Sequence, residues 1–110
     1  MLPQRLRLRR SADFVTIVKR GRKATRPTLV VYAMESARAR VGLIVGRGVG
    51  GSVERNRVKR RLRHQARSLI DESAPMDVVI RALPPAGAPG ADLAGDLADA
   101  WQRAGKAVAA

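Results

Sequence analysis

The stretch GGSVERNRVKRRLRHQARSLI, at residues 50–70, decides how the rest of the sequence is interpreted. Its apolar residues recur at spacings of four, four, three and one, in the order Val58, Leu62, Ala66, Leu69 and Ile70. This periodicity predicts an amphipathic helix with one face to bury. Ser52 is the expected N-cap, and Glu54 lies in the first turn, where the helix dipole favours an acid.

Seven Lys and Arg side chains lie between residues 55 and 67 of this predicted helix, together with the only histidine. At about 100° per residue they form two flanks beside the apolar stripe. One flank holds Asn56, Lys59, Arg63 and Arg67. The other holds Arg57, Arg61 and His64, and Arg60 lies on the outer side. Because like charges at this spacing repel one another, we expect an anionic partner to offset the repulsion.

The whole chain has the same bias. Its 110 residues include 22 Lys and Arg against 9 Asp and Glu, a formal net charge of +13. Residues 1–67 hold 19 basic and 3 acidic side chains, whereas residues 68–110 hold 3 basic and 6 acidic ones. Such segregation is typical of a surface that binds a polyanion, and it favours nucleic acid over a membrane surface.

Length and composition exclude several other classes. The length allows one domain, residues 1–110, which we expect to be flexible at residues 1–8 and 105–110. The absence of cysteine excludes disulfides and thiolate zinc sites, and it fits a reducing compartment such as the cytoplasm. The longest apolar run, Leu29–Met34, is too short to cross a membrane, so no membrane partner is expected.

The remaining segments predict a small sheet covered by helices. Ser11 is the expected N-cap of a helix that ends at Gly21. Residues 28–34 and 40–45 are predicted strands, joined by a turn into an antiparallel hairpin. Residues 78–82 form a further strand, and Asp92 caps a last helix. The fold class is therefore α/β (α+β), a two-layer sandwich.

A glycine-rich loop precedes the basic helix and allows another interpretation. Gly46, Gly48 and Gly51 match the pattern G-x-G-x-x-G, and Asp71 lies 20 residues further on, so a dinucleotide site is one alternative. However, Asp71 closes a helix, whereas the dinucleotide fold needs an acid at the end of a strand. The loop is either an anion site, to which Arg47 adds charge, or a flexible connection.

The sequence offers little for catalysis by side chains. His64 lies alone among arginines, which favours an RNA contact over a general base. Asp71 and Glu72 close a helix, and Asp77 precedes a strand, so no carboxylate pair or metal-ligand spacing is apparent. We expect no catalytic residue, metal site or small-molecule cofactor in this chain.

The segment Arg55-Asn56-Arg57-Val58-Lys59-Arg60-Arg61-Leu62-Arg63 resembles the signature of the protein subunit of bacterial ribonuclease P. Further matches stand in the family's order across residues 2–83: Leu2-Pro3, Arg5-Leu6, Asp13-Phe14, Lys19-Arg20-Gly21, Val31-Tyr32, Val41-Gly42-Leu43, Val49-Gly50 and Asp77-Val78-Val79. The resemblance implies the order α-β-β-β-α-β-α and a small mixed sheet with three helices. It also implies an unusual left-handed βαβ crossover, as in ribosomal protein S5 domain 2-like folds.

The same resemblance implies an RNA-binding cofactor of ribonuclease P, which removes the 5′ leader of precursor tRNA. The expected partners are the catalytic RNA subunit, which would hold most of the Mg²⁺ and perform the chemistry, and precursor tRNA. The implied RNA-binding residues are Arg47, Arg55, Asn56, Arg57, Lys59, Arg60, Arg61, Arg63 and Arg67. Those implied to line a cleft for the leader are Phe14, Tyr32, Arg55, Asn56, Lys59 and Arg63.

Two alternatives stay open. Phe14 and Tyr32 either stack on leader bases or only pack the core. A structural RNA-binding protein of the ribosomal type would share the charge without a cleft for a single strand. The chain also departs from the family pattern, since Val18 stands where an aromatic residue is common and Gly46-Arg47-Gly48 where Ser-Lys-Lys is common.

Overall fold

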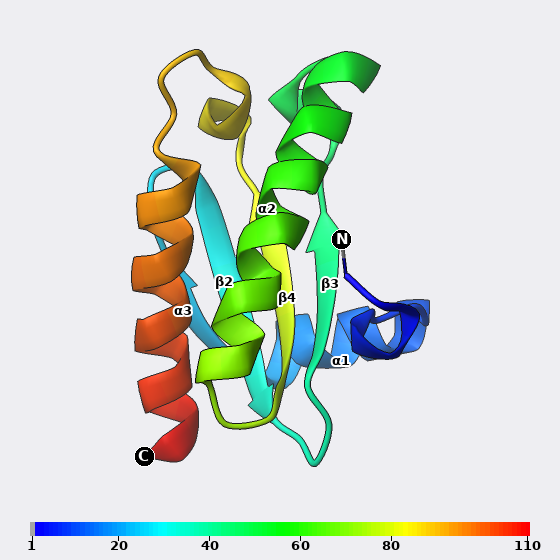
Figure 1. The fold of residues 1–110 in the computed structure, drawn as a ribbon, viewed down its shortest axis with the longest axis vertical. Coiled ribbons are helices and arrows are strands. Elements are labelled where there is room, and N and C mark those ends of the chain that lie inside the picture. Colours follow the sequence, from blue (N-terminus) through cyan, green and yellow to red (C-terminus); the bar gives the residue numbers. More distant parts are fainter. Residues whose placement is uncertain (1) are drawn as a thin grey trace.

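A computed structural model describes residues 2–110 as a four-stranded sheet covered by helices (Figure 1). The helices are α1 (Ser11–Arg20), α2 (Ser52–Glu72) and α3 (Leu93–Ala109), and the strands are β1 (Arg22–Thr25), β2 (Leu29–Glu35), β3 (Arg40–Ile44) and β4 (Met76–Ala82). Three short 3₁₀ turns are η1 (Gln4–Leu6), η2 (Arg47–Val49) and η3 (Pro84–Gly87). The predicted order α-β-β-β-α-β-α is confirmed.

The sheet is mixed, with the strand order β1-β2-β4-β3. β2 pairs with β1 and β4 in antiparallel fashion, whereas β3 pairs with β4 in parallel. In Figure 1, α2 connects β3 to β4 and lies in front of the sheet, and β4 lies to the left of β3. The crossover is therefore left-handed, against the strong general preference for right-handed connections. The unusual crossover that the resemblance implied is thus present.

The predicted hairpin of residues 28–34 and 40–45 is wrong. β2 and β3 are not neighbours, because β4 lies between them. The hairpin in this sheet joins β1 to β2 instead, with Arg22 opposite Ala33 and Thr25 opposite Val30. The residue pattern gave no sign of β1, since three of its four residues are exposed. The hairpin was predicted because β2 and β3 are close in the sequence. In the structure, the apolar strand β4 lies between them at the centre of the sheet.

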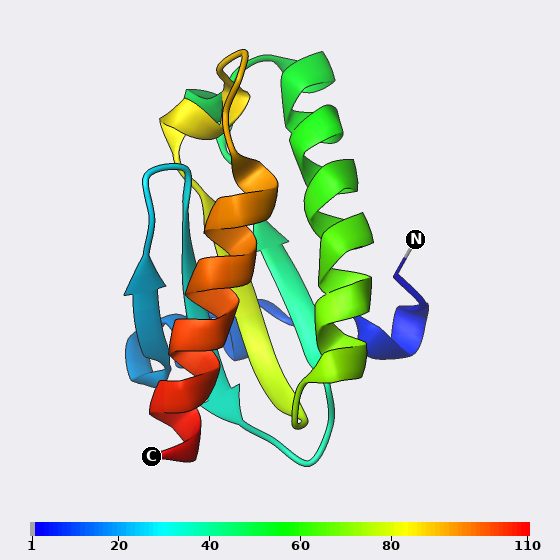
Figure 2. The same cartoon turned by 60° about the vertical axis from the view of Figure 1, so that its left-hand side comes forward.

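Alternating side chains divide the core between the two faces. Leu29, Val31 and Ala33 of β2 join the larger cluster, which contains the buried residues of α2 and α3. Val30 and Tyr32 belong to the smaller cluster, with Ile17 of α1. α2 and α3 lie side by side over one face of the sheet (Figure 2), and α1 packs on the other. The sheet and the pair α2 and α3 therefore form the two layers of the predicted sandwich, and α1 adds a single helix on the opposite face of the sheet.

The helix ends differ from the expectations in two of three cases. Ser11 and Ser52 are the first residues of α1 and α2, and the N-caps are Arg10 and Gly51, neither of which makes a side-chain capping bond. Asp92 caps α3 as predicted, because its Oδ1 accepts a hydrogen bond from the backbone N–H of Gly95 at 3.0 Å. Only the third cap therefore uses side-chain capping chemistry.

The segments expected to be flexible make contacts with the domain. Leu2 and Leu8 are buried, and the Leu8 N–H donates to the Val41 carbonyl of β3 at 2.9 Å. At the other end, α3 continues to Ala109 and Val108 packs against the larger cluster. Met1 lies outside the described residues. The mobility of these segments stays a prediction, but burial of Leu2 and Leu8 opposes it for the first segment.

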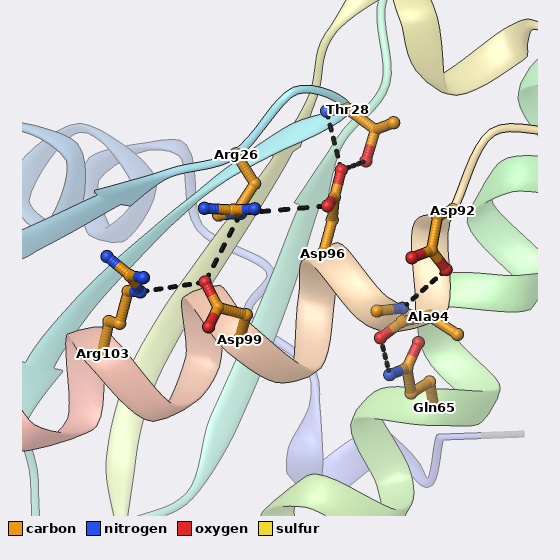
Figure 3. Close-up of polar contacts among 9 residues, drawn as sticks. Arg26, Thr28, Gln65, Asp92, Ala94, Asp96, Asp99 and Arg103 are labelled. Carbon is orange, nitrogen blue, oxygen red and sulfur yellow. Dashed lines mark hydrogen bonds and ion pairs between the residues drawn. The ribbon is translucent and has the colours of Figure 1, made fainter.

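Charged side chains attach α3 to the β1–β2 hairpin (Figure 3). Asp96 is buried, and its Oδ2 accepts hydrogen bonds from the Thr28 N–H at 3.0 Å and the Thr28 hydroxyl at 2.7 Å. The Arg26 Nε lies 3.4 Å from the Asp99 carboxylate, which also pairs with Arg103 at 2.9 Å. The carboxylates of Asp96 and Asp99 in α3 thus bind groups of the same domain.

Candidate nucleic-acid interface

The predicted apolar stripe of α2 faces the sheet and leaves its cations outside. Val58, Leu62 and Ala66 are buried, and Leu69 and Ile70 pack against the same cluster. Arg57, Arg60 and Arg61 are exposed, as is Asn56, whereas Arg55, Lys59, Arg63 and Arg67 are half-buried. Helical geometry alone therefore directs all seven cations to the rim or the outer side of one helix.

None of these seven cations forms an ion pair within residues 2–110. Every ion pair in that part of the chain uses Arg26, Arg40 or Arg103, none of which belongs to α2. The guanidinium of Arg55 makes only a long contact with the Ser52 hydroxyl, at 3.4 Å. The charge of α2 is thus available for an external anion.

The two flanks of α2 face different neighbours. Arg61 and His64 lie beside the segment that leads into α3, and together with Ala91 they line a shallow hollow. Gln65 joins the two helices there, since its side-chain N–H donates to the Ala94 carbonyl at 2.7 Å. The other flank, with Lys59, Arg63 and Arg67, lies on the side of α2 away from α3 and so towards the β3 edge of the sheet.

The glycine-rich loop is held in place before α2. Val49 of η2 and Ala86 of η3 are buried, and Gly87 lies so close to the Val49 carbonyl that a Cβ would collide with it. Gly50 has a backbone φ of 150°, which residues other than glycine rarely adopt. Arg47 is exposed on η2, at the N-terminal end of α2. The loop thus adds one more free cation to that end of the helix.

Tyr32 of β2 belongs to the smaller cluster, and Phe14 of α1 packs against it from the helix side. Phe14 is half-buried, and its ring lies directly over the Cα of Gly42 in β3, where a Cβ would clash. Tyr32 is only 8% exposed. Both rings therefore contribute to the packing of α1 on the sheet. Contact with bound RNA stays a prediction for both.

Arg40 anchors α1 to this face of the sheet. Its guanidinium donates two hydrogen bonds to the Asp77 carboxylate, at 3.0 and 2.7 Å, and lies 3.6 Å from Asp13 of α1. The hydrogen bond to Asp77 raises the pKa of Arg40 above its usual value, and the charges of Asp77 and Asp13 act in the same direction against the effect of burial. Asp77 lies within β4 rather than before it, and its role here is structural.

The aromatic and basic parts of the expected cleft lie on opposite faces of the sheet. Phe14 and Tyr32 are on the α1 face, whereas Arg55, Asn56, Lys59 and Arg63 project from α2. Phe14 covers Gly42 of β3, whereas Tyr32 lies on β2, which β4 separates from β3. The structure thus separates the aromatic residues from the basic ones by the thickness of the sheet, and a shared cleft stays a prediction.

Comparison with known proteins shows to which family the chain belongs. The family model described as Ribonuclease P matches residues 2–105. The chain belongs to the ribonuclease P protein family. The Ribonuclease P protein component of Streptomyces avermitilis is 48% identical over 116 aligned positions, covering 94% of each chain. That of Mycobacterium bovis is 54% identical over 87, covering 76% of this chain and 75% of the relative.

Solved structures share the fold. The RNase P protein of Staphylococcus aureus superposes with a TM-score of 0.82 at 25% identity, over 90% of this chain and 94% of that one. That of Thermotoga maritima gives 0.76 at 24% identity, over 88% and 96%. Membership of the family implies RNA binding and tRNA processing within a ribonucleoprotein. The dinucleotide alternative is therefore wrong, and Asp71 is exposed in the last turn of α2.

Residues 2–110 contain neither a membrane-spanning helix nor a cluster of metal-binding side chains. No helix there is long and apolar enough to cross a membrane. Within the same residues, no group of three or more His, Cys, Asp or Glu side chains is arranged to hold a metal ion.

Sequence reasoning missed two cations on the α1 face. Lys23 of β1 lies opposite Tyr32, and Arg81 of β4 lies opposite Val30. Both are exposed. Side chains alternate between the two faces along a strand, and this alternation could have placed both cations on the α1 face. Its use would have required knowing that residues 22–25 form a strand and that β4 is central in the sheet.

Proposed function

We propose that this protein is the RNA-binding cofactor of ribonuclease P, which assists a catalytic RNA in removing the 5′ leader from precursor tRNA. The observation that carries the proposal is the set of seven α2 cations without an ion pair in the described residues. Phosphate groups of RNA would neutralise these cations and release counterions, which is the main source of affinity in such complexes.

In this proposal, one surface of the protein binds the catalytic RNA and another binds the leader. Arg57, Arg60 and Arg61 on α2, with Arg47 from η2, bind the catalytic RNA. The single-stranded leader passes along the β3 side of the molecule, outside the N-terminal segment that pairs with β3 at Val41, between the other α2 flank and the α1 face. Unstacked bases then meet the apolar side of the sheet, and phosphates meet Lys59 and Arg63. The exposure of the first four cations supports this division, as does the half-buried position of Lys59 and Arg63 on the other flank of α2.

The chemistry belongs to the RNA subunit in this proposal, with Mg²⁺ bound there. The side chains at the proposed interface are mainly guanidinium and ammonium groups, which attract phosphate and repel Mg²⁺. By neutralising phosphates they lower the repulsion between RNA strands, so the RNA folds and retains Mg²⁺ at a lower concentration. We expect the protein to act in the cytoplasm, where its precursor tRNA substrate would be found.

One reconstitution tests the proposal. The catalytic RNA cleaves precursor tRNA at low Mg²⁺ with and without the protein, using substrates with long and one-nucleotide leaders. We expect the protein to increase cleavage, and more so for the long leader. A ribosomal-type RNA-binding protein would give no such dependence on leader length. Cleavage at full rate by protein free of RNA would overturn the proposal.

The affinity for the catalytic RNA adds a second check. If about six phosphates are neutralised, affinity falls by about a thousandfold between roughly 50 and 200 mM salt. A change of less than about tenfold over that range would contradict an interface built on α2 cations.

A further inference from the structure

The 3₁₀ turn η3 packs against the loop at residues 46–50, which leads into α2. η3 contacts both η2 and α2, and Figure 2 shows η2 and η3 together at the upper end of the molecule. Ala86 of η3 and Val49 of η2 are 4% and 7% exposed, and both belong to the larger core cluster. A segment that follows β4 in the sequence therefore supports the loop that precedes α2.

Backbone atoms make the closest contact between these two segments. A Cβ on Gly87 would collide with the carbonyl oxygen and carbon of Val49. A Cβ on Gly48 would lie 3.5 Å from the Cγ of Pro84, which is ordinary van der Waals contact. Because the atoms that meet Gly87 belong to the backbone, they cannot move aside as the end of a flexible side chain can. Glycine at position 87 therefore allows η3 to approach the loop closely.

η3 is itself held in place by hydrogen bonds and by proline. The Leu83 N–H, which precedes the turn, donates to the Thr28 carbonyl at 2.8 Å, and the Ala86 N–H donates to the Leu83 carbonyl at 2.8 Å. Pro84 and Pro85 begin the turn, and their rings restrict the backbone φ angle. η3 thus offers the loop a support that has little conformational freedom of its own.

The loop has fewer restrictions within itself. Three of the five residues at positions 46–50 are glycine, which gives an isolated loop many accessible conformations. Its own backbone hydrogen bonds run from the Val49 N–H to the Gly46 carbonyl and from the Gly50 N–H to the Arg47 carbonyl, both at 3.1 Å. The packing of Val49 against η3 therefore contributes to the order of the loop.

The loop carries Arg47, which is exposed and forms no ion pair within residues 2–110. A cation on a mobile loop loses conformational freedom when it binds a phosphate, and that loss weakens the affinity. A cation on a loop that is already ordered avoids most of this loss. The order of residues 46–50 therefore determines how tightly Arg47 can bind.

We propose that η3 is a positioning element for RNA binding, which holds the loop at residues 46–50 so that Arg47 meets RNA phosphate. Gly87 is the positioning residue, because it permits the close contact with Val49. The inference rests on the proposed function, since it takes RNA as the ligand of Arg47. It adds a role for residues that carry no charge and that lie outside residues 46–67, where the cations of the proposed RNA interface lie.

The test compares two variants that introduce the same kind of collision. Gly87→Ala places a methyl group against the Val49 carbonyl, and Gly21→Ala, the matched control, places one against the Ile17 carbonyl at the end of α1. Each variant is titrated with the catalytic RNA, and thermal unfolding measures its stability. We expect both variants to lower the melting temperature, whereas only Gly87→Ala weakens the RNA affinity, by about tenfold.

A double-mutant cycle tests whether this effect depends on Arg47. Arg47→Ala should weaken the RNA affinity of the wild-type protein by about tenfold, but by less than about twofold when Gly87→Ala is already present. Arg67→Ala removes a cation in the C-terminal part of α2, and its effect should be the same with and without Gly87→Ala. A loss of stability alone would leave Arg47→Ala with its full effect in both cases.

Hydrogen exchange in the free protein tests the positioning without RNA. The N–H groups of Val49 and Gly50 should exchange faster in Gly87→Ala than in the wild-type protein, because their hydrogen bonds within the loop open more often. Gly21→Ala should leave these two exchange rates unchanged. Should Gly87→Ala fail to fold, Ala86→Gly loosens η3 without a collision, and it should weaken the RNA affinity by about threefold.

Four results would each overturn the inference. Gly21→Ala could weaken the RNA affinity as much as Gly87→Ala does, which would make the effect one of folding. Arg47→Ala could keep its full effect beside Gly87→Ala, or have no effect on the wild-type protein. The exchange rates in the loop could be the same in Gly87→Ala and the wild-type protein. Failure of the proposed function looks different, since the wild-type protein would then neither bind the catalytic RNA nor increase cleavage, while loop exchange would still respond to Gly87→Ala.

Discussion

α2 and α3 lie side by side on the same face of the sheet, yet they use their charges in opposite ways. In α3, Asp96 and Asp99 are engaged by Thr28, Arg26 and Arg103. In α2, none of the seven cations has an acidic partner among residues 2–110. Both helices bury an apolar stripe in one common core.

This difference separates charge that serves the fold from charge that serves binding. A buried carboxylate such as Asp96 must be hydrogen-bonded, because an unpaired charge away from water is costly. The α2 cations stay in water and repel one another, which destabilises the free protein slightly. Their removal should therefore affect binding, whereas removal of the α3 contacts should affect stability.

The largest expected effect is on assembly with the catalytic RNA. Replacing Arg57 and Arg61 with alanine removes two charged groups that bind phosphate, and we expect binding to weaken about a hundredfold. The salt slope should fall by roughly 0.7 to 0.9 for each phosphate that the variant no longer neutralises. The measurement is a binding titration at several salt concentrations.

The matched control is Arg103→Ala with Lys106→Ala, which removes the same charge from α3. We expect it to change RNA affinity by less than about threefold, although bulk charge is equal. Equal weakening by both pairs would mean that net charge, rather than the α2 surface, governs binding. If the α2 pair instead weakened only leader binding, the division of surfaces proposed above would be wrong.

The next largest effect is on stability. Asp96→Ala leaves the buried N–H and hydroxyl of Thr28 without their acceptor, and we expect a loss of about 2 to 3 kcal/mol in the free energy of unfolding. Thr28→Val removes only the hydroxyl bond and should cost less. Urea denaturation gives both values.

Arg60→Ala is the corresponding change on α2. It should alter the free energy of unfolding by no more than about 0.5 kcal/mol, since the side chain is exposed and has no acidic partner in the described chain. A large destabilisation by Arg60→Ala would show that α2 cations also hold the fold.

Simple anions should stabilise the free protein through α2. At ten times its dissociation constant, sulfate or pyrophosphate should add about 1.4 kcal/mol, roughly 5 °C in the melting temperature. The variant with Arg57 and Arg61 replaced should respond less, and the variant with Arg103 and Lys106 replaced should respond like wild type. The absence of any shift in the wild-type melting curve would count against anion sites on α2.

The smallest effect concerns the exposed pair on α3. Arg103→Ala breaks an i,i+4 ion pair with Asp99 in which the arginine side chain is 65% exposed. Such pairs contribute about 0.3 to 0.5 kcal/mol, so the melting temperature should move by a few degrees at most. A larger loss would show that Arg103 supports Asp99 in holding Arg26.

The sequence predicted the helices well because their signals are local. The apolar spacing of α2, the N-cap at Asp92 and the stop at Gly21 each depend on neighbours within a few residues. The caps at Ser11 and Ser52 were misplaced by one residue, because the preceding backbone begins the helix without a side-chain bond. The strand pairing failed, since β4 pairs with segments more than 30 residues earlier in the chain.

The sequence by itself determined that this is a basic protein with a two-flanked cationic helix, and the family motif identified which helix it is. Charge and 3.6-residue periodicity are properties of consecutive residues, so they can be read without coordinates. Only the tertiary structure decided that β4 separates β2 from β3, that Phe14 lies across the sheet from α2, and that η3 supports the loop before α2. These depend on which distant segments pair, and that choice is made by the burial of the whole core at once.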